Sequence, residues 1–387
     1  MATLNSPSST AGVPGHPNAL VLDEVGKPMH VELRPTPKPS PGSVLIRVLA
    51  SSIRANSRRV YEEPTSGHPL PTPFVPGFAT IGRVAETGPD ATRLQGGQLV
   101  FFDPYIIARD SPDAKYISGL MECVDEESKR LSRGEWRDST FAEFANLPLE
   151  NCFPLDEARL MGPSQDGGLG YTLDNLTHLF SMLIPFGGLA DIDLKAGETV
   201  IIAPATGRYG SAAVHLALAL GARVIAIGRN RTVLQQLSTI HPQRLSAVPI
   251  ARDVDADTQA LRAVAGPSGA GVFWDMSPPG AGTSTHFTSS LNVLKNGARI
   301  SLMGSVLSGV SFDYMQILVK GLTIKGTWMC TKEQTRRLIS MVETGSLPLD
   351  TQSMGPVRTF SLGDWAAAFN TGAERTEPGE VIIAHKA

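Results

Sequence analysis

The chain has 387 residues, of which 42% are hydrophobic and 18% charged, and its formal net charge is −3 at pH 7. This length predicts about two domains, and the composition is ordinary for a globular protein. The small negative charge predicts no binding to nucleic acid or to anionic membranes. No apolar run approaches the roughly 20 residues of a membrane-spanning helix.

The amino-terminal segment, residues 1–17, is rich in Ser, Thr, Pro and Gly. It lacks a basic start and an apolar core, so we expect a flexible tail rather than a secretion signal. Three cysteines, Cys123, Cys152 and Cys330, lie far apart, and no CxxC pair occurs. This pattern favours neither a disulfide framework nor a cysteine-based structural zinc site. It fits a cytoplasmic, reducing location.

The first half of the chain is typical of short strands separated by Pro and Gly. Residues 43–50 alternate apolar and polar side chains, as a half-buried strand does. Residues 81–86 and 98–102 have the same pattern. Between residues 103 and 140 the composition becomes charged and irregular, which predicts a surface excursion.

From about residue 197 strands alternate with helices. Strands are expected at residues 199–203, 223–227, 271–274 and 298–303, and helices at 211–220, around Val233 to Ile240, and around Phe287, Leu291 and Leu294. This alternation predicts βαβ units in a doubly wound parallel sheet.

The last segment of the chain is predicted to contain a helix and a closing strand. Ser361 and Asp364 have the spacing of a helix-capping box, with Leu362, Trp365 and Phe369 as the buried stripe. Residues 381–384 would form a closing strand, and we expect this segment to fold back onto the amino-terminal domain.

A turn rich in small residues follows the first strand of the predicted parallel sheet. Small residues let the backbone approach a pyrophosphate, and the next helix offers free N–H groups and a positive dipole. The pattern is degenerate because Ala replaces the first of the usual three glycines, so a plain strand–turn–helix stays open. The candidate cofactor-binding residues here are Ala205, Thr206, Gly207, Arg208, Tyr209 and Gly210.

The second strand ends in Gly228, Arg229, Asn230 and Arg231. An NAD-binding domain usually places a carboxylate about 20 residues past the turn, where it would repel a 2′-phosphate. Arginine instead pairs with phosphate through two hydrogen bonds. We therefore predict NADPH as the cofactor; the alternative is that these arginines are solvated loop charges.

The order of these parts resembles the medium-chain dehydrogenase/reductase family. The resemblance extends from Asn18 to the carboxyl terminus and rests on residues 76–82 (PGFATIG), 205–210 (ATGRYG), 297–304 (GARISLMG) and 324–326 (IKG). The segments PTPFVPG and LKAGETVIIAPATGRYG are most similar to zinc-independent members of fungal secondary metabolism.

The resemblance implies an α/β fold made of a GroES-like β-barrel domain and a Rossmann domain with a doubly wound parallel sheet. The expected division is a tail at 1–17, a catalytic domain at 18–180, a Rossmann NADPH-binding domain at 181–328, and a chain return at 329–387 that completes the catalytic domain. It also implies contact of Met303 and Gly304 with the cofactor, and a possible homodimer, since the last Rossmann strand often pairs across a dimer.

The resemblance also locates the positions of zinc ligands in zinc-dependent members. Arg54 stands in place of the early Cys, and Phe78 and Ala79 stand in place of His and Glu. The four structural-zinc cysteines are missing from residues 103–140. Because Arg, Phe and Ala cannot ligate a metal, we expect no zinc.

Without a metal to polarise oxygen, the zinc-free branch reduces activated carbon–carbon double bonds or quinones. The implied catalytic residues are Arg54, which could stabilise an enolate or bind a carboxylate, and Tyr61, which could donate a proton. Ser57 and Phe78 are expected to shape the substrate pocket. The alternative is structural: Arg54 fills the vacated metal site and Tyr61 packs under residues 71–76.

Two further residues are expected to be structural, His178 as a hydrogen-bonding residue and Cys330 as inert core.

The leading hypothesis is an NADPH-dependent reductase of a small conjugated enone, enoyl or quinone substrate. The alternatives are a zinc-free carbonyl reductase or alcohol dehydrogenase, and an NADPH-binding protein without redox turnover that has a structural or cyclisation-templating role.

Overall fold

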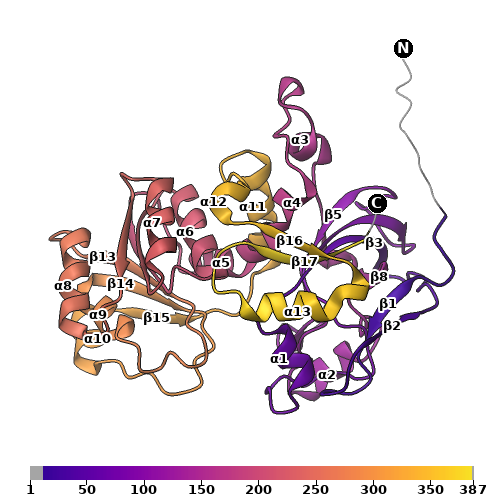
Figure 1. The fold of residues 1–387 in the computed structure, drawn as a ribbon, viewed down its shortest axis with the longest axis horizontal. Coiled ribbons are helices and arrows are strands. Elements are labelled where there is room, and N and C mark those ends of the chain that lie inside the picture. Colours follow the sequence, from indigo (N-terminus) through magenta and orange to yellow (C-terminus); the bar gives the residue numbers. More distant parts are fainter. Residues whose placement is uncertain (1–11, 386–387) are drawn as a thin grey trace.

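The computed structural model describes residues 12–385, so most of the expected flexible tail at residues 1–17 lies outside the described part. Its described end is held in place, because the carbonyls of Gly15 and Pro17 accept hydrogen bonds from the backbone N–H groups of Thr36 and Arg34. Two lobes lie side by side, one built on a parallel sheet and the other on a mainly antiparallel sheet (Figure 1).

The first lobe contains a six-stranded sheet in the order β12-β11-β10-β13-β14-β15, and every neighbouring pair is parallel. Reversal of the strand order between β10 and β13 is the mark of a doubly wound sheet. The strands are β10 (Thr199–Ala203), β11 (Arg223–Gly228), β12 (Leu245–Pro249), β13 (Ala270–Asp275), β14 (Leu294–Leu302) and β15 (Thr323–Gly326).

Helices cover both faces of this sheet, because successive side chains of a strand point to opposite faces. In β10, Val200 and Ile202 pack in the core shared with α5, α6 and α7, whereas Ile201 and Ala203 pack in the core shared with α8 and α9. The helices of this lobe are α5 (Leu179–Asp191), α6 (Arg208–Ala219), α7 (Arg231–Ile240), α8 (Val254–Ala265), α9 (His286–Val293) and α10 (Tyr314–Lys320).

The second lobe contains a seven-stranded sheet in the order β16-β17-β3-β4-β5-β9, with β8 also paired to β3. Its strands are β3 (Ser43–Ser52), β4 (Thr80–Thr87), β5 (Leu99–Phe102), β8 (Phe144–Pro148), β9 (Cys152–Pro154), β16 (Val357–Phe360) and β17 (Glu380–Ala384). Two small hairpins add β1 (Asn18–Val21), β2 (His30–Leu33), β6 (Tyr105–Ile107) and β7 (Lys115–Ile117).

Short helices complete this lobe. They are α1 (Ser57–Glu62), α2 (Glu126–Ser132), α3 (Glu157–Met161), α4 (Leu173–Thr177), α11 (Lys332–Glu343), α12 (Thr351–Met354) and α13 (Trp365–Glu374), with 3-10 turns at Leu149–Asn151, Ser164–Asp166 and Leu362–Asp364. The closing strand β17 pairs antiparallel with β3, which confirms that the last segment returns to the amino-terminal lobe (Figure 1).

Four local expectations differ from the structure. Residues 103–140 are not only a surface excursion, since the stretch around β7 through Leu120 is largely buried. Strand β12 and helix α8 were not expected, and Leu294 begins β14 instead of closing the stripe of α9. The capping box at Ser361 does not form, because the Ser361 hydroxyl donates to the Asp364 carboxylate at 2.6 Å and caps no backbone N–H.

Among the described residues, no helix is both long and apolar enough to cross a membrane.

Candidate functional site in the cleft between the lobes

The turn between β10 and α6 is built for close backbone approach. A Cβ at Gly210 would lie 1.9 Å from the Pro204 carbonyl oxygen, so only glycine fits where α6 passes the end of β10. Helix α6 begins after Gly207, which provides no side-chain cap, and a Cβ at Gly207 would meet nothing within 4 Å. The first N–H groups of α6 therefore face open space, a suitable place for a phosphate.

The end of β11 presents Arg229 and Arg231, both exposed, and neither forms a hydrogen bond or ion pair within residues 12–385. Between them, the Asn230 side chain caps α7 by accepting a hydrogen bond from Val233 N–H at 3.2 Å. The cap fixes the loop and leaves both guanidinium groups available to a ligand.

A third arginine lies beside this strand end. Arg252 follows β12, whose last residue pairs with Gly228 in the register of the sheet. It is exposed and adopts a left-handed backbone at φ 66°, which is uncommon for a residue with a Cβ. The sequence analysis did not single it out because strand β12 itself was not expected.

The carboxyl ends of β13 and β14 meet next to the turn. Met303 N–H donates to the Asp275 carbonyl at 2.9 Å, and a Cβ at Gly304 would lie 2.7 Å from the Ser277 backbone. Below them, Asp275 accepts from the Ser277 hydroxyl at 2.6 Å and lies 3.0 Å from His286 Nε2. All three side chains are buried, so this network shapes the turn rather than facing solvent.

Arg208 joins the two lobes. Its guanidinium donates to the Ile53 carbonyl and the Ser52 hydroxyl, both at 2.8 Å, and forms an ion pair with Glu380 of β17. The Glu380 side chain is fully buried and that of Arg208 is 13% exposed. Burial raises the pKa of Glu380 to about 7, although Arg208 opposes the shift. The side chain expected to contact a cofactor is thus occupied between the lobes, and only the Arg208 backbone N–H remains for that role.

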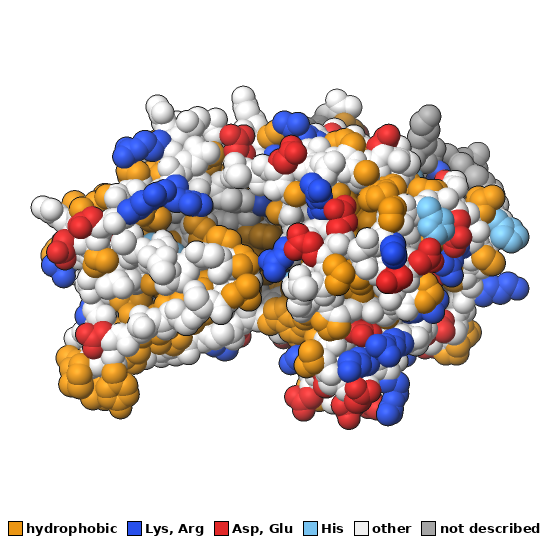
Figure 2. Space-filling view, turned by 60° about the horizontal axis from the view of Figure 1, so that its bottom comes forward, with side chains coloured by type: hydrophobic (Ala, Val, Ile, Leu, Met, Phe, Trp, Pro, Cys, Tyr) orange, Lys and Arg blue, Asp and Glu red, His pale blue; other side chains and the backbone are white. Residues whose placement is uncertain are grey.

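Arg54 lies where the two lobes meet. Its guanidinium carbon is 4.5 Å from the centre of the Phe78 ring and 5.7 Å from that of Tyr209, which belongs to α6. The Ser57 hydroxyl accepts from Arg54 N–H at 3.0 Å and holds the loop that carries it. The structure therefore brings Arg54, Ser57 and Phe78 together with Tyr209, and Figure 2 shows a notch between the two lobes.

Tyr61 lies in the core of the antiparallel lobe. It is 1% exposed, its ring packs 5.6 Å from Phe369, and its hydroxyl donates to the Gly119 carbonyl at 2.8 Å. Burial raises the pKa of Tyr61 well above its ordinary value. The hydroxyl proton is engaged in the core, which favours a structural role for Tyr61 over the predicted proton-donating one.

The expected structural residues are buried. His178 is fully buried, but neither ring nitrogen has a hydrogen-bond partner among residues 12–385, which corrects the expected hydrogen-bonding role. Burial and the nearby His215 lower the pKa of His178 to about 4. The Cys330 thiol is also buried, which raises its pKa and fits inert core.

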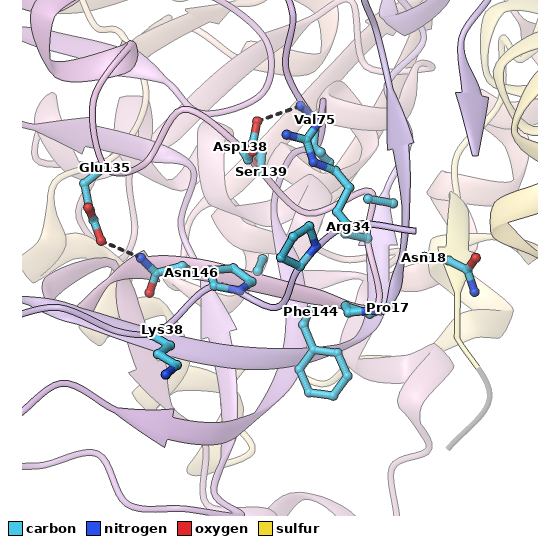
Figure 3. A pocket seen from close by; sticks show the side chains of 15 residues that line it. Pro17, Asn18, Arg34, Lys38, Val75, Glu135, Asp138, Ser139, Phe144 and Asn146 are labelled. Atoms are coloured by element: carbon cyan, nitrogen blue, oxygen red, sulfur yellow. Dashed lines mark hydrogen bonds between the residues drawn. The ribbon is translucent and has the colours of Figure 1, made fainter. Parts of the chain in front are cut away.

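One pocket lies away from these residues. It has a volume of about 220 Å³ and is lined by residues of the antiparallel lobe (Figure 3). Its lining side chains already bond one another: Glu135 accepts from Asn146 at 2.9 Å, and Asp138 accepts from Val75 N–H at 2.9 Å. None of the candidate site residues lines this pocket.

Two family profiles match the two lobes. The profile described as "Alcohol dehydrogenase GroES-like domain" matches residues 40–157, and the one described as "Zinc-binding dehydrogenase" matches residues 210–344. Together they cover most of the chain in the order that the fold requires. The chain belongs to the medium-chain dehydrogenase/reductase family.

Curated relatives match this dehydrogenase over nearly its whole length. An L-threonine 3-dehydrogenase of Alteromonas mediterranea is 26% identical over 91% of this chain and 95% of its own. That of Anaeromyxobacter dehalogenans is 25% identical over 90% and 93%. These similarities make the protein an oxidoreductase of a nicotinamide-dependent family.

Solved structures share the fold of this medium-chain dehydrogenase/reductase. An alcohol dehydrogenase structure from Sinorhizobium meliloti superposes with a TM-score of 0.74 at 22% identity, covering 96% of this chain and 97% of the other. A thermostable alcohol dehydrogenase from Pyrobaculum aerophilum gives 0.71 at 19% identity, with 96% and 100% covered. The likeness confirms the expected GroES-like and Rossmann architecture.

The sequence analysis expects Arg54 and Phe78 at positions of zinc ligands in zinc-dependent relatives, and in this family member the Arg54 guanidinium carbon lies over the Phe78 ring. Over residues 12–385, no group of three or more His, Cys, Asp or Glu side chains is arranged to hold a metal ion.

Proposed function

We propose that the protein is an NADPH-dependent, zinc-independent reductase of an activated carbon–carbon double bond of the enone, enoyl or quinone type. The observation that carries the proposal is the Arg54–Phe78 pair at the former ligand positions, beside a turn suited to a dinucleotide. A cation and an aromatic ring bind a polar conjugated substrate by charge and stacking, without a Lewis acid.

The residues of the cleft fit a nicotinamide dinucleotide. The open space at Gly207 and the free start of α6 suit the pyrophosphate, and Arg229 and Arg231 suit a 2′-phosphate. When bound, NADPH supplies the hydride, so that enone, NADPH and a proton give the saturated carbonyl compound and NADP⁺. Arg54 offers its charge to an anionic group of the substrate, either the developing enolate oxygen or a carboxylate, and we assign the proton to solvent because Tyr61 is buried.

A carbonyl reductase or alcohol dehydrogenase is the second candidate, because the matched relatives carry such names. One solved relative from Escherichia coli is described as complexed with NADH, at 16% identity and a TM-score of 0.74. The names of the relatives favour reduction of a carbonyl group over a carbon–carbon double bond, and the bound NADH favours NADH over NADPH. The cytoplasm is the compartment we propose, since all three cysteines are free.

We expect the purified protein to oxidise NADPH in the presence of trans-3-nonen-2-one and to yield 2-nonanone. Loss of nicotinamide absorbance gives the rate, and mass spectrometry identifies the product. Dialysis against 1,10-phenanthroline should leave the rate unchanged, because no step needs a metal. Reduction of 2-nonanone itself would favour the second candidate, and loss of activity after chelation would disprove zinc independence.

We also propose a homodimer formed through the edge of the parallel sheet. Strand β15 lies at that edge with all four residues exposed, and α10 beside it exposes Tyr314, Leu318 and Val319 at 76%, 61% and 72%. Figure 2 shows hydrophobic side chains gathered at the outer end of this lobe. An unpaired edge next to an apolar patch is typical of a subunit interface.

Substitution of Leu318→Glu together with Val319→Glu is expected to convert the dimer to a monomer in sedimentation-velocity experiments, because charges would be buried in the interface. Val124→Glu is the matched control, since Val124 is 79% exposed on the other lobe. A monomeric wild-type protein would rule out the dimer.

A further inference from the structure

Arg54 contacts two aromatic rings, and its hydrogen-bond donors are unused within residues 12–385. Phe78 and Tyr209 contribute aromatic rings at 4.5 and 5.7 Å from the guanidinium carbon. Arg54 Nε is buried and has no partner within residues 12–385, and no hydrogen bond or ion pair is formed by the rest of that guanidinium. Contact with an aromatic ring does not satisfy the N–H donors, which lie around the edge of the guanidinium.

Within residues 12–385, no carboxylate forms an ion pair with Arg54. The acidic groups at the end of α1 are engaged elsewhere: Glu62 pairs with Arg58 at 2.9 Å and Glu63 with Arg59 at 3.6 Å. The charge of Arg54 acts on two titratable groups, His68 and Tyr61, and neither is an anion. The positive charge of Arg54 contributes to a lowered pKa of His68, behind burial as the main cause.

Arg54 carries a partly buried charge without a partner within residues 12–385, which is unfavourable. Elsewhere in the same structure Arg208 shows the ordinary solution, a buried arginine paired with Glu380. The missing partner of Arg54 is therefore best supplied by a ligand that carries a planar anion.

We propose that Arg54 binds a carboxylate of the substrate, so that the enzyme acts on conjugated carbonyl compounds that also carry an acid group. This inference rests on the proposed reductase function and narrows its substrate class. Phe78 and Tyr209 set the plane of the guanidinium, and the carboxylate accepts two parallel hydrogen bonds from its edge. The conjugated part of the substrate then extends into the cleft from a fixed anchor.

A second anion could compete for the same donors. Tyr209 belongs to the turn suited to the cofactor pyrophosphate, so the free edge of Arg54 could serve a phosphate instead of a carboxylate. The two sources differ in one measurable respect: a carboxylate site remains selective when the cofactor is already bound, whereas a pyrophosphate site does not.

The test is a binding measurement that needs no turnover. The NADP⁺-loaded protein is titrated with 4-oxo-4-phenylbutanoate and with its isosteric primary amide, using calorimetry or saturation-transfer NMR. Loss of a charge-assisted pair corresponds to about ten-fold or more in affinity, so the acid should bind at least about ten-fold more tightly than the amide. If the protein binds no nucleotide, the same titration on the free protein still measures the preference.

Variants of Arg54 test whether this residue causes the preference for the acid over the amide. Arg54→Gln should abolish the difference between acid and amide, and Arg54→Lys should retain part of it, because lysine keeps the charge but loses the two-pronged geometry. Arg58→Gln removes an exposed arginine from the adjoining helix and should keep the full preference. Nicotinamide fluorescence measures NADPH affinity separately for each variant.

Three results would overturn the proposal. One is equal affinity of the wild-type protein for acid and amide, or no saturable binding of either. Another is a preference for the acid that survives in Arg54→Gln. The third is an Arg54→Gln variant that loses NADPH affinity while the preference for the acid is intact, which would assign the residue to the pyrophosphate.

Discussion

Substitution of Arg229 and Arg231 by alanine is expected to lower the affinity for NADPH by about a hundred-fold and to leave the affinity for NADH nearly unchanged. Each charge-assisted contact with the 2′-phosphate contributes about 1.5–3 kcal/mol, so each single variant should lose roughly ten-fold or more. Both side chains are exposed and free of protein partners within residues 12–385. Their removal therefore costs the fold little.

Fluorescence titration with the two nucleotides measures this effect. Arg223→Ala is the matched control, because Arg223 is exposed at the opposite end of the same strand β11. Equal binding of NADPH and NADH by the wild-type protein would refute the cofactor assignment. A fall in both affinities in the double variant would instead indicate damage to the turn.

Arg208→Met is expected to destabilise the protein by about 3–5 kcal/mol, since it leaves the fully buried Glu380 carboxyl group without its ion-pair partner. The substitution also removes the hydrogen bonds to the Ile53 carbonyl and the Ser52 hydroxyl. Chemical denaturation followed by fluorescence gives the change in the free energy of unfolding.

A double variant separates the contribution of the ion pair to stability from that of side-chain packing. Arg208→Met combined with Glu380→Met removes both partners, so we expect it to recover part of the loss, because an apolar pair can replace a buried ion pair. Arg223→Met, at an exposed arginine, should change the free energy of unfolding by less than about 0.5 kcal/mol. An Arg208→Met variant as stable as the wild type would show that the ion pair does not hold the lobes together.

Much of the fold could be predicted because its signals are local. The strand at Thr199–Ala203 was expected with the same bounds, and the closing strand was expected within one residue of Glu380–Ala384. An apolar pattern of period two or 3.6 depends only on neighbouring residues. Strand β12 was missed because its burial pattern is mixed, with two buried residues among five, which gives little periodicity.

The candidate site was predictable only in part. The positions of Arg54 and Phe78 followed from family resemblance, and the sequence proposed a role for each without showing that they touch. Tyr61 illustrates the limit: a tyrosine seven residues after Arg54 is in the core, because α1 turns its side chain toward Phe369 and Gly119. The direction of a side chain depends on which elements pack around it.

The sequence by itself determined the alternation of strands and helices in the parallel-sheet lobe, apart from β12 and α8, and a basic strand end without a carboxylate. The tertiary structure decided which charges are free. Arg208 and Glu380 are 172 residues apart, and their ion pair takes Arg208 from the cofactor turn, whereas Arg54 is left between two rings with no anion. Both outcomes follow from packing the two lobes together, since burial and pairing of a charge are set by neighbours distant in sequence.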